Sequence, residues 1–218
     1  MADSTLAQLG AIAERRWGLL TTSQAESAGV SRKQLSRMAS AGALERVAQG
    51  VYRISGAPRQ DHEALYATWL ALGGATTPRT PDGVAAAVAA GTTAALVHGI
   101  GDFLPDSFDF IVPARKGTRL ADVRLRIRSL TRDEVIPVHG LPTLSVERTI
   151  ADLVEIGTDT SLVADAVQDA VRTDRLTAPD RLATYLDRAA ARQGSTGQSL
   201  VKDLFELAGA EPEGWHHA

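Results

Sequence analysis

The chain of 218 residues contains no cysteine. This absence excludes disulfide bonds, cysteine-ligated zinc, iron–sulfur clusters and thiol catalysis. Lysine is rare, and no apolar run reaches the roughly 18 residues that a membrane-spanning helix needs. The first residues also lack the basic-then-apolar order of a signal peptide. We therefore expect a cytoplasmic protein with no membrane association, whose 44% hydrophobic residues suffice for a substantial core.

Charge is unevenly distributed along the chain, although the net charge is only −3. Residues 1–56 hold seven basic and four acidic residues, and residues 115–132 hold seven basic residues and one acidic residue. Residues 57–114 and 133–218 carry net charges of −4 and −8. A basic leading segment in an otherwise acidic chain indicates an anionic partner for that segment, and nucleic acid would satisfy it.

The basic leading segment shows the pattern of a winged helix-turn-helix. Apolar residues at helical spacing predict a first helix, and Thr22 or Ser23 can cap a second short helix that Gly29 closes. Ser31 can cap a third helix over residues 32–41. Two short strands then follow around a turn that contains Gly50, as in a wing. The domain is expected to cover residues 1–56.

The third helix and the wing supply the predicted DNA contacts. One face of the helix is apolar, and the opposite face is polar and cationic. A helix fits the major groove, and wing cations can follow phosphates or the minor groove. The alternative is a protein-interaction module with a solvated charged face. The predicted DNA-binding residues are Ser31, Arg32, Lys33, Ser36, Arg37, Arg46, Gln49 and Arg53.

Three blocks of the sequence resemble the AbiEi family of antitoxins. They are residues 13–25 and 29–31 with 44–53, residues 94–100, and residues 140–153. The resemblance implies an antitoxin of an AbiE toxin–antitoxin system, which neutralises a nucleotidyltransferase toxin (AbiEii-like) and represses its own operon by binding promoter DNA. It implies operator DNA and the cognate toxin as partners. We expect a monomer or weak dimer, with cooperative binding to DNA left open.

Residues 57–218 predict a second, helix-rich domain with a small sheet, so that the whole chain is α+β or α/β. Its last part, from about residue 145, reads as helical throughout. The Ala-rich segment 84–97 is expected to form two short helices broken at Gly91. Predicted strands lie at 108–112, 123–129, 135–138 and 141–144, and predicted helices at 61–72, 145–157, 161–172, 180–191 and 198–208.

The predicted strand 123–129 alternates strictly between aliphatic residues and arginine. This pattern is typical of a half-buried strand with one wet, cationic face. Its functional interpretation is a second surface for nucleic acid or an acidic partner, and its simpler interpretation is ordinary protection of a sheet edge. The acidic helices that follow could cover the basic surface of a toxin. The second basic surface comprises Arg115, Lys116, Arg119, Arg124, Arg126 and Arg128.

No catalytic residue, cofactor or metal site is predicted. The Gly-rich segment 194–199 lacks the lysine and the preceding strand of a phosphate loop. His98 follows an apolar run and is expected to be packed, and Arg148 with Asp152 reads as an ion pair within one helix. One enzymatic alternative stays open, because some similar antitoxins are reported to phosphorylate their toxin without a recognisable kinase motif.

Overall fold

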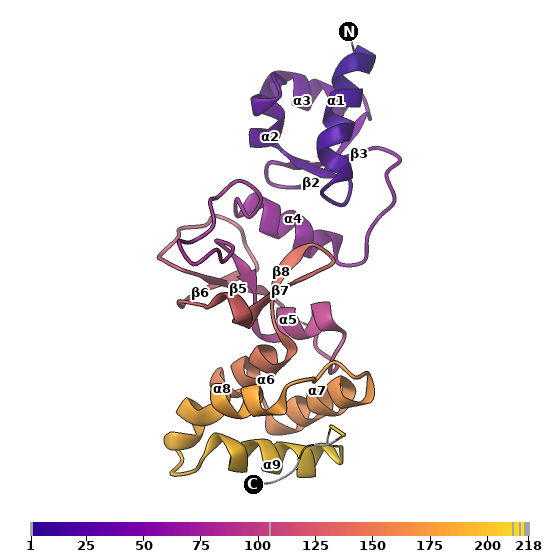
Figure 1. The fold of residues 1–218 in the computed structure, drawn as a ribbon. Coiled ribbons are helices and arrows are strands. Elements are labelled where there is room, and N and C mark those ends of the chain that lie inside the picture. Colours follow the sequence, from indigo (N-terminus) through magenta and orange to yellow (C-terminus); the bar gives the residue numbers. More distant parts are fainter. Residues whose placement is uncertain (1, 105, 211, 214, 216–218) are drawn as a thin grey trace. The chain divides into compact units, whose positions relative to one another are not determined.

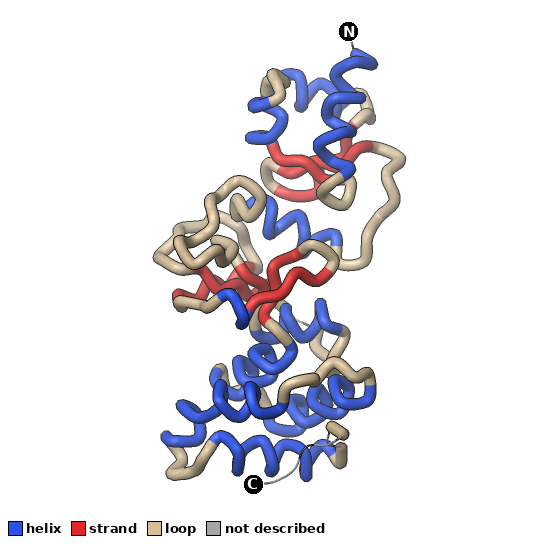
Figure 2. The backbone as a smooth tube through the Cα atoms, in the orientation of Figure 1, coloured by secondary structure: helices blue, strands red, loops and turns tan. Residues whose placement is uncertain are grey.

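The structure, a computed structural model, describes residues 2–104, 106–210, 212–213 and 215. The chain divides into two compact units, whose helices and sheets confirm the predicted α+β class (Figures 1 and 2). Unit 1 comprises Met1–Pro78 with Thr118–Leu120, and unit 2 comprises Arg79–Gly117 with Ala121–Ala218. Within the described residues, no helix has both the length and the apolar character to cross a membrane.

Unit 1 begins with three helices and a small antiparallel sheet in the order β1-β3-β2. The helices and the sheet enclose a core that includes Leu9, Leu20, Leu35 and Leu44. Strand β1 extends the two strands of the predicted wing to three and was not predicted. The elements are α1 (Ala2–Glu14), β1 (Leu19–Thr21), α2 (Thr22–Ser27), α3 (Arg32–Ser40), β2 (Leu44–Ala48) and β3 (Val51–Ile54).

Two reciprocal caps fix the helix-turn-helix. Ser31 caps α3 as predicted, because its hydroxyl accepts a hydrogen bond from the Gln34 amide and the Gln34 side chain accepts one from the Ser31 amide. Helix α2 has the same arrangement between Thr21 and Gln24, so its cap lies one residue before the predicted position at Thr22 or Ser23.

Helix α4 (Glu63–Ala71) belongs to unit 1. The ring of Trp17 stacks on that of Tyr66, with centroids 4.2 Å apart and planes 5° from parallel, and it meets Trp69 edge-on. These aromatic contacts join the end of α1 to α4. The first compact unit therefore continues to Pro78, beyond the boundary at residue 56 that the sequence suggested.

Unit 2 contains a mixed five-stranded sheet in the order β6-β5-β4-β8-β7. The β4–β8 and β5–β6 pairs are parallel, whereas β4–β5 and β7–β8 are antiparallel. Segment 84–97 differs from the prediction, because it forms strand β4 (Val88–Ala89) and one helix, α5 (Gly91–His98), rather than two helices. The other strands are β5 (Phe108–Val112), β6 (Val123–Ile127), β7 (Val135–Val138) and β8 (Leu141–Leu144).

Four helices complete unit 2 and follow the predicted ranges closely. Ser145 caps α6 as predicted, since its hydroxyl accepts a hydrogen bond from the Arg148 amide. Figure 1 shows these helices gathered together beyond α5, and their apolar faces share one core with residues of α5 and the loop that follows it. The helices are α6 (Val146–Glu155), α7 (Thr160–Arg172), α8 (Pro179–Ala191) and α9 (Gly197–Ala208).

Candidate nucleic-acid interface and a buried ion cluster

Helix α3 presents a polar, cationic face to solvent. Leu35 is fully buried, whereas Lys33, Ser36, Arg37 and Ser40 are exposed. Neither Lys33 nor Arg37 forms an ion pair with any described residue. We call these four exposed residues the recognition face. Unpaired cations on a helix that is capped at its first turn suit contacts to base edges and phosphates.

The remaining predicted contacts at the start of α3 have structural roles as well. Ser31 is exposed but its hydroxyl is engaged in the cap of α3. The guanidinium of Arg32 pairs with Glu26 at 2.9 Å across the turn, and both side chains are largely solvated. A solvated ion pair of this kind contributes little stability and can exchange its partner for a phosphate.

The wing divides its predicted contacts into exposed and buried residues. Arg46 and Gln49 are exposed, as the prediction requires. Arg53 is instead buried, with 3% of its surface exposed, and its guanidinium pairs with Glu45 and, at 3.1 Å, with Glu63 of α4. The hydrogen bond with Glu45 raises the pKa of Arg53, so it stays charged. Arg53 thus connects the wing to α4 and does not offer its charge to phosphate.

The predicted second basic surface is also divided by the structure. Arg115, Arg119 and Arg124 are exposed, and Lys116 is half-buried. Arg126 of β6 and Arg128, which follows that strand, pair with carboxylates of α6. The prediction of a wet, cationic strand face is therefore wrong at these two positions.

The environment of this edge strand varies along its length. Arg124 is exposed as predicted, and Ile127 on the aliphatic side of β6 is 62% exposed. Arg126 and Arg128 are partly buried because α6 supplies Asp152 and Glu155 as their partners, which the alternating pattern cannot reveal.

Asp152 is the centre of this buried ion cluster. Its side chain is fully buried, accepts hydrogen bonds from Arg126 Nη1 and from the Gly91 amide, each at 2.9 Å, and lies 3.6 Å from Arg148. Arg126 also binds Asp109 at 2.9 Å. The cluster thus joins α5, α6, β5 and β6, and we define it as Asp109, Arg126, Arg128, Glu134, Arg148, Asp152 and Glu155.

Burial acts in opposite directions on the members of the cluster. It raises the pKa of Asp109, although Arg126 beside it partly offsets this effect. For Arg126, burial alone would lower the pKa, but hydrogen bonds and attraction from Asp152 and Asp109 raise it instead. The predicted Arg148–Asp152 pair is confirmed, and Arg148 additionally binds Glu155 at 2.7 Å and lies over the ring of Tyr185.

Two further buried polar groups are structural. His98 places Nε2 2.7 Å from the Leu144 carbonyl oxygen, and burial lowers its pKa, which agrees with its prediction as a packed residue. Glu147 accepts hydrogen bonds from the amides of Thr177 and Ala178 at the start of α8, each at 3.1 Å. It holds the segment that leads into α8, whose N-cap residue Ala178 has no side-chain cap.

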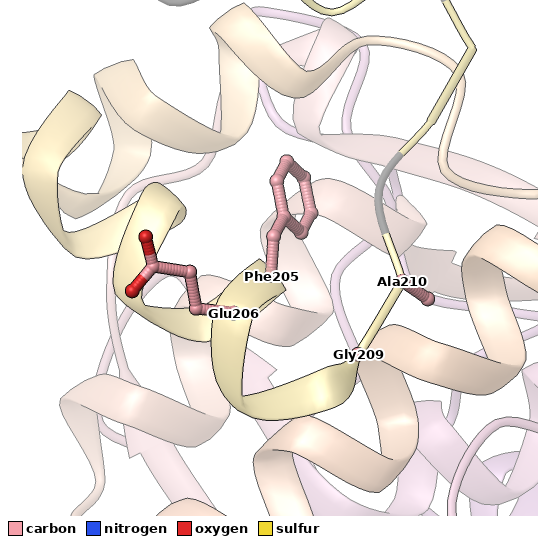
Figure 3. Close-up of a pocket in the computed structure, with 4 residues that line it drawn as sticks. All are labelled: Phe205, Glu206, Gly209 and Ala210. Atoms are coloured by element: carbon pink, nitrogen blue, oxygen red, sulfur yellow. The ribbon is translucent and has the colours of Figure 1, made fainter.

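The described residues contain no group of three or more histidine and carboxylate side chains that could hold a metal ion. A pocket of about 300 Å³ lies where α9 ends and is lined by Phe205, Glu206, Gly209 and Ala210 (Figure 3). Among the described residues, Glu206 is the one charged side chain in its lining.

Residues 8–55, which run from α1 through the wing, match the family model described as "Transcriptional regulator, AbiEi antitoxin". They form an AbiEi antitoxin regulator domain. The exposed cations of the recognition face and of the wing lie within this AbiEi domain, and so does the buried Arg53.

The whole chain is similar in fold to the RV2827C protein from Mycobacterium tuberculosis. That comparison covers 95% of this chain and 78% of the other, with a TM-score of 0.54 and 18% sequence identity. The likeness therefore extends beyond the AbiEi domain into unit 2, at the level of fold alone. No curated protein matches the chain.

Proposed function

We propose that this protein is the antitoxin of a bacterial toxin–antitoxin system, which represses its own operon through unit 1 and neutralises a nucleotidyltransferase toxin (AbiEii-like) through unit 2. The observation that carries the DNA-binding part is the recognition face, whose Lys33 and Arg37 are exposed and unpaired among the described residues. It belongs to a domain that matches a family of antitoxin regulators.

Phosphate contacts supply affinity in this mechanism, and base contacts supply specificity. Arg46 of the wing and Arg32 beside the cap would bind phosphates, so that affinity falls steeply as salt rises. Lys33 and Arg37 would reach base edges in the major groove. A single winged helix covers few base pairs, which favours operators with repeated half-sites and binding by more than one copy.

Repression is tested with the DNA upstream of the gene. Fluorescence anisotropy across a salt series should show specific binding by the wild type and strongly reduced binding by the double variant Lys33→Ala/Arg37→Ala. Arg188→Ala is the matched control, because Arg188 is exposed on α8 and is expected to leave binding unchanged. Equal binding by the double variant and the wild type would reject the recognition face as the DNA interface.

Neutralisation is supported by the charge of unit 2, since an enzyme that handles nucleic acid needs basic surface and residues 133–218 carry a net charge of −8. Its test is growth of cells that express the toxin with and without this chain. Charge reversal belongs at exposed acids such as Asp165 and Asp203. Asp169 is unsuitable, because it accepts a hydrogen bond from the Gly101 amide.

A failure of the chain to rescue growth would reject the antitoxin assignment even if promoter binding is observed. Phosphate transfer from ATP to the purified toxin would replace neutralisation by binding with the enzymatic alternative.

A further inference from the structure

Leu104 is the most exposed of the large apolar side chains in the described part of the chain, with 89% of its surface in solvent. It lies in the loop between α5 and β5. The preceding residue, Phe103, is buried in the core that the helices of unit 2 share. Two adjacent apolar residues thus have opposite environments, one anchored inside and the other outside.

The loop is held firmly where Leu104 leaves the core. The Gly101 amide donates a hydrogen bond to Asp169 Oδ2 at 2.9 Å, and the other oxygen of Asp169 accepts one from Arg172 at 2.6 Å. Gly101 has a φ of +66°, and a Cβ at this position would lie 2.6 Å from the Phe103 ring. The backbone that precedes Leu104 is therefore constrained at Gly101, and Phe103 is anchored in the core.

The charged residues that flank Leu104 in the sequence are both acidic. Asp102 and Asp106 flank it in the sequence, are exposed, and form no ion pair with a described residue. No lysine or arginine occurs between Arg79 and Arg115. An apolar side chain between two free carboxylates is suited to a partner surface with an apolar socket and a basic rim, because lysine and arginine present apolar stems beside their charges.

We propose that Asp102, Leu104 and Asp106, which we call the Leu104 site, form a docking point for the cognate toxin. The inference rests on the proposed function, in which the partner handles nucleic acid and so carries basic surface. Leu104 fills an apolar socket on the toxin, and the two aspartates pair with basic residues around it. DNA is not the occupant, because both flanking carboxylates would repel its phosphates.

The experiment measures binding of the full chain to the purified nucleotidyltransferase encoded beside its gene, by calorimetry and biolayer interferometry. Leu104→Ser should weaken the affinity by about tenfold or more, the effect of leaving one leucine unburied. Asp102→Asn/Asp106→Asn should slow association at low salt and flatten its salt dependence. Leu207→Ser is the matched control, because Leu207 is 56% exposed on α9 and is expected to be neutral.

The outcomes separate the inference from the proposed function. Unchanged affinity of Leu104→Ser, with an unchanged circular dichroism spectrum and melting temperature, overturns the Leu104 site. Rescue of growth by the wild type without measurable binding also overturns it but leaves the antitoxin function standing. If light scattering shows that the wild type is a dimer and that Leu104→Ser is a monomer, the occupant is a second copy and the toxin-docking proposal is wrong.

Discussion

Arginines of the two units differ in their environment. In unit 1, Arg37 and Arg46 are exposed and unpaired among the described residues, whereas in unit 2 Arg148 is buried and Arg126 partly buried against carboxylates. Arg53 is the exception within unit 1, since it is buried between two glutamates. An arginine is available to an anionic partner where the fold leaves it solvated, and Arg32 stays in this class although it pairs with Glu26, because both side chains are largely exposed.

This difference shows why a charge pattern alone does not define a binding surface. The arginines of β6 gave the strongest alternating pattern in the sequence, yet two of them stabilise the fold. The arginines of α3 belong to a weaker sequence pattern, but they lie on a helix whose buried face consists of apolar residues. The four predictions below test the comparison, from the largest expected effect to the smallest.

Asp152→Ala should have the largest effect, because it leaves Arg126 and the Gly91 amide without their buried partner. We expect a loss of about 3–5 kcal/mol in the unfolding free energy of unit 2. Urea denaturation followed by circular dichroism measures it, with promoter binding by unit 1 retained. Asp165→Ala, at an exposed site on α7, is the control and should shift stability by less than about 0.5 kcal/mol. If Asp152→Ala leaves the unfolding free energy unchanged, the ion cluster does not stabilise unit 2.

Arg53→Ala tests whether unit 1 contains an arginine of the buried class. Removal of the guanidinium leaves Glu45 and Glu63 unpaired, and we expect a loss of about 2 kcal/mol or more in stability. At a temperature where the variant is folded, the salt dependence of promoter binding should equal that of the wild type. If the slope of log affinity against log salt concentration falls by the amount expected for about one phosphate contact, Arg53 binds DNA instead.

Arg37→Ala tests the exposed class in the same unit. We expect a cost of about 1–3 kcal/mol in binding to the preferred operator, with relaxed preference at the contacted base pair. Stability should change little, since Arg37 is solvated. Competition binding against operators changed at single base pairs provides the measurement, and a loss that is uniform over all sequences would assign Arg37 to phosphate.

His98 provides a pH-dependent test of unit 2. Burial lowers the pKa of His98 below that of the unfolded chain, about 6.5, and its neighbours include Arg175 and Glu147. As pH falls below 6.5, the unfolded state therefore binds a proton that the folded state does not, and stability falls by up to about 1.4 kcal/mol per pH unit. Melting temperatures at pH 7.5 and 5.5 should show this loss.

His98→Gln is the control for the pH experiment. It removes the titrating group and should remove most of the pH dependence, whatever its effect on stability at pH 7.5. The same acid sensitivity in this variant would assign the effect to the carboxylates of the ion cluster.

The sequence predicted those elements whose signals are local. Ser31 and Ser145 each cap the helix that follows, and the strand ranges from 108 to 144 were predicted closely. Strands β1 and β4 were missed, because they have three and two residues and are too short for an alternating pattern. Their pairing depends on β3, β5 and β8, which lie elsewhere in the chain.

The candidate site was predictable to the same extent. Exposure of Lys33, Ser36 and Arg37 follows from helical spacing within α3. The ion pairs of Arg53 and Arg126 do not follow from local spacing, because their partners Glu63 and Asp152 lie 10 and 26 residues away in the sequence. The exposed Leu104 was missed for a similar reason, because only the packing of Phe103 and Asp169 determines which way the loop turns.

The aromatic stack of unit 1 has a consequence for spectroscopy. Trp17 stacks on Tyr66 and meets Trp69 edge-on, whereas the third tryptophan, Trp215, meets Phe205 of unit 2 edge-on with centroids 4.6 Å apart. Replacement of Trp215 by phenylalanine would confine indole emission to the AbiEi domain and α4. The fluorescence of that variant would then report on unit 1 alone in tests of the proposed promoter and toxin binding.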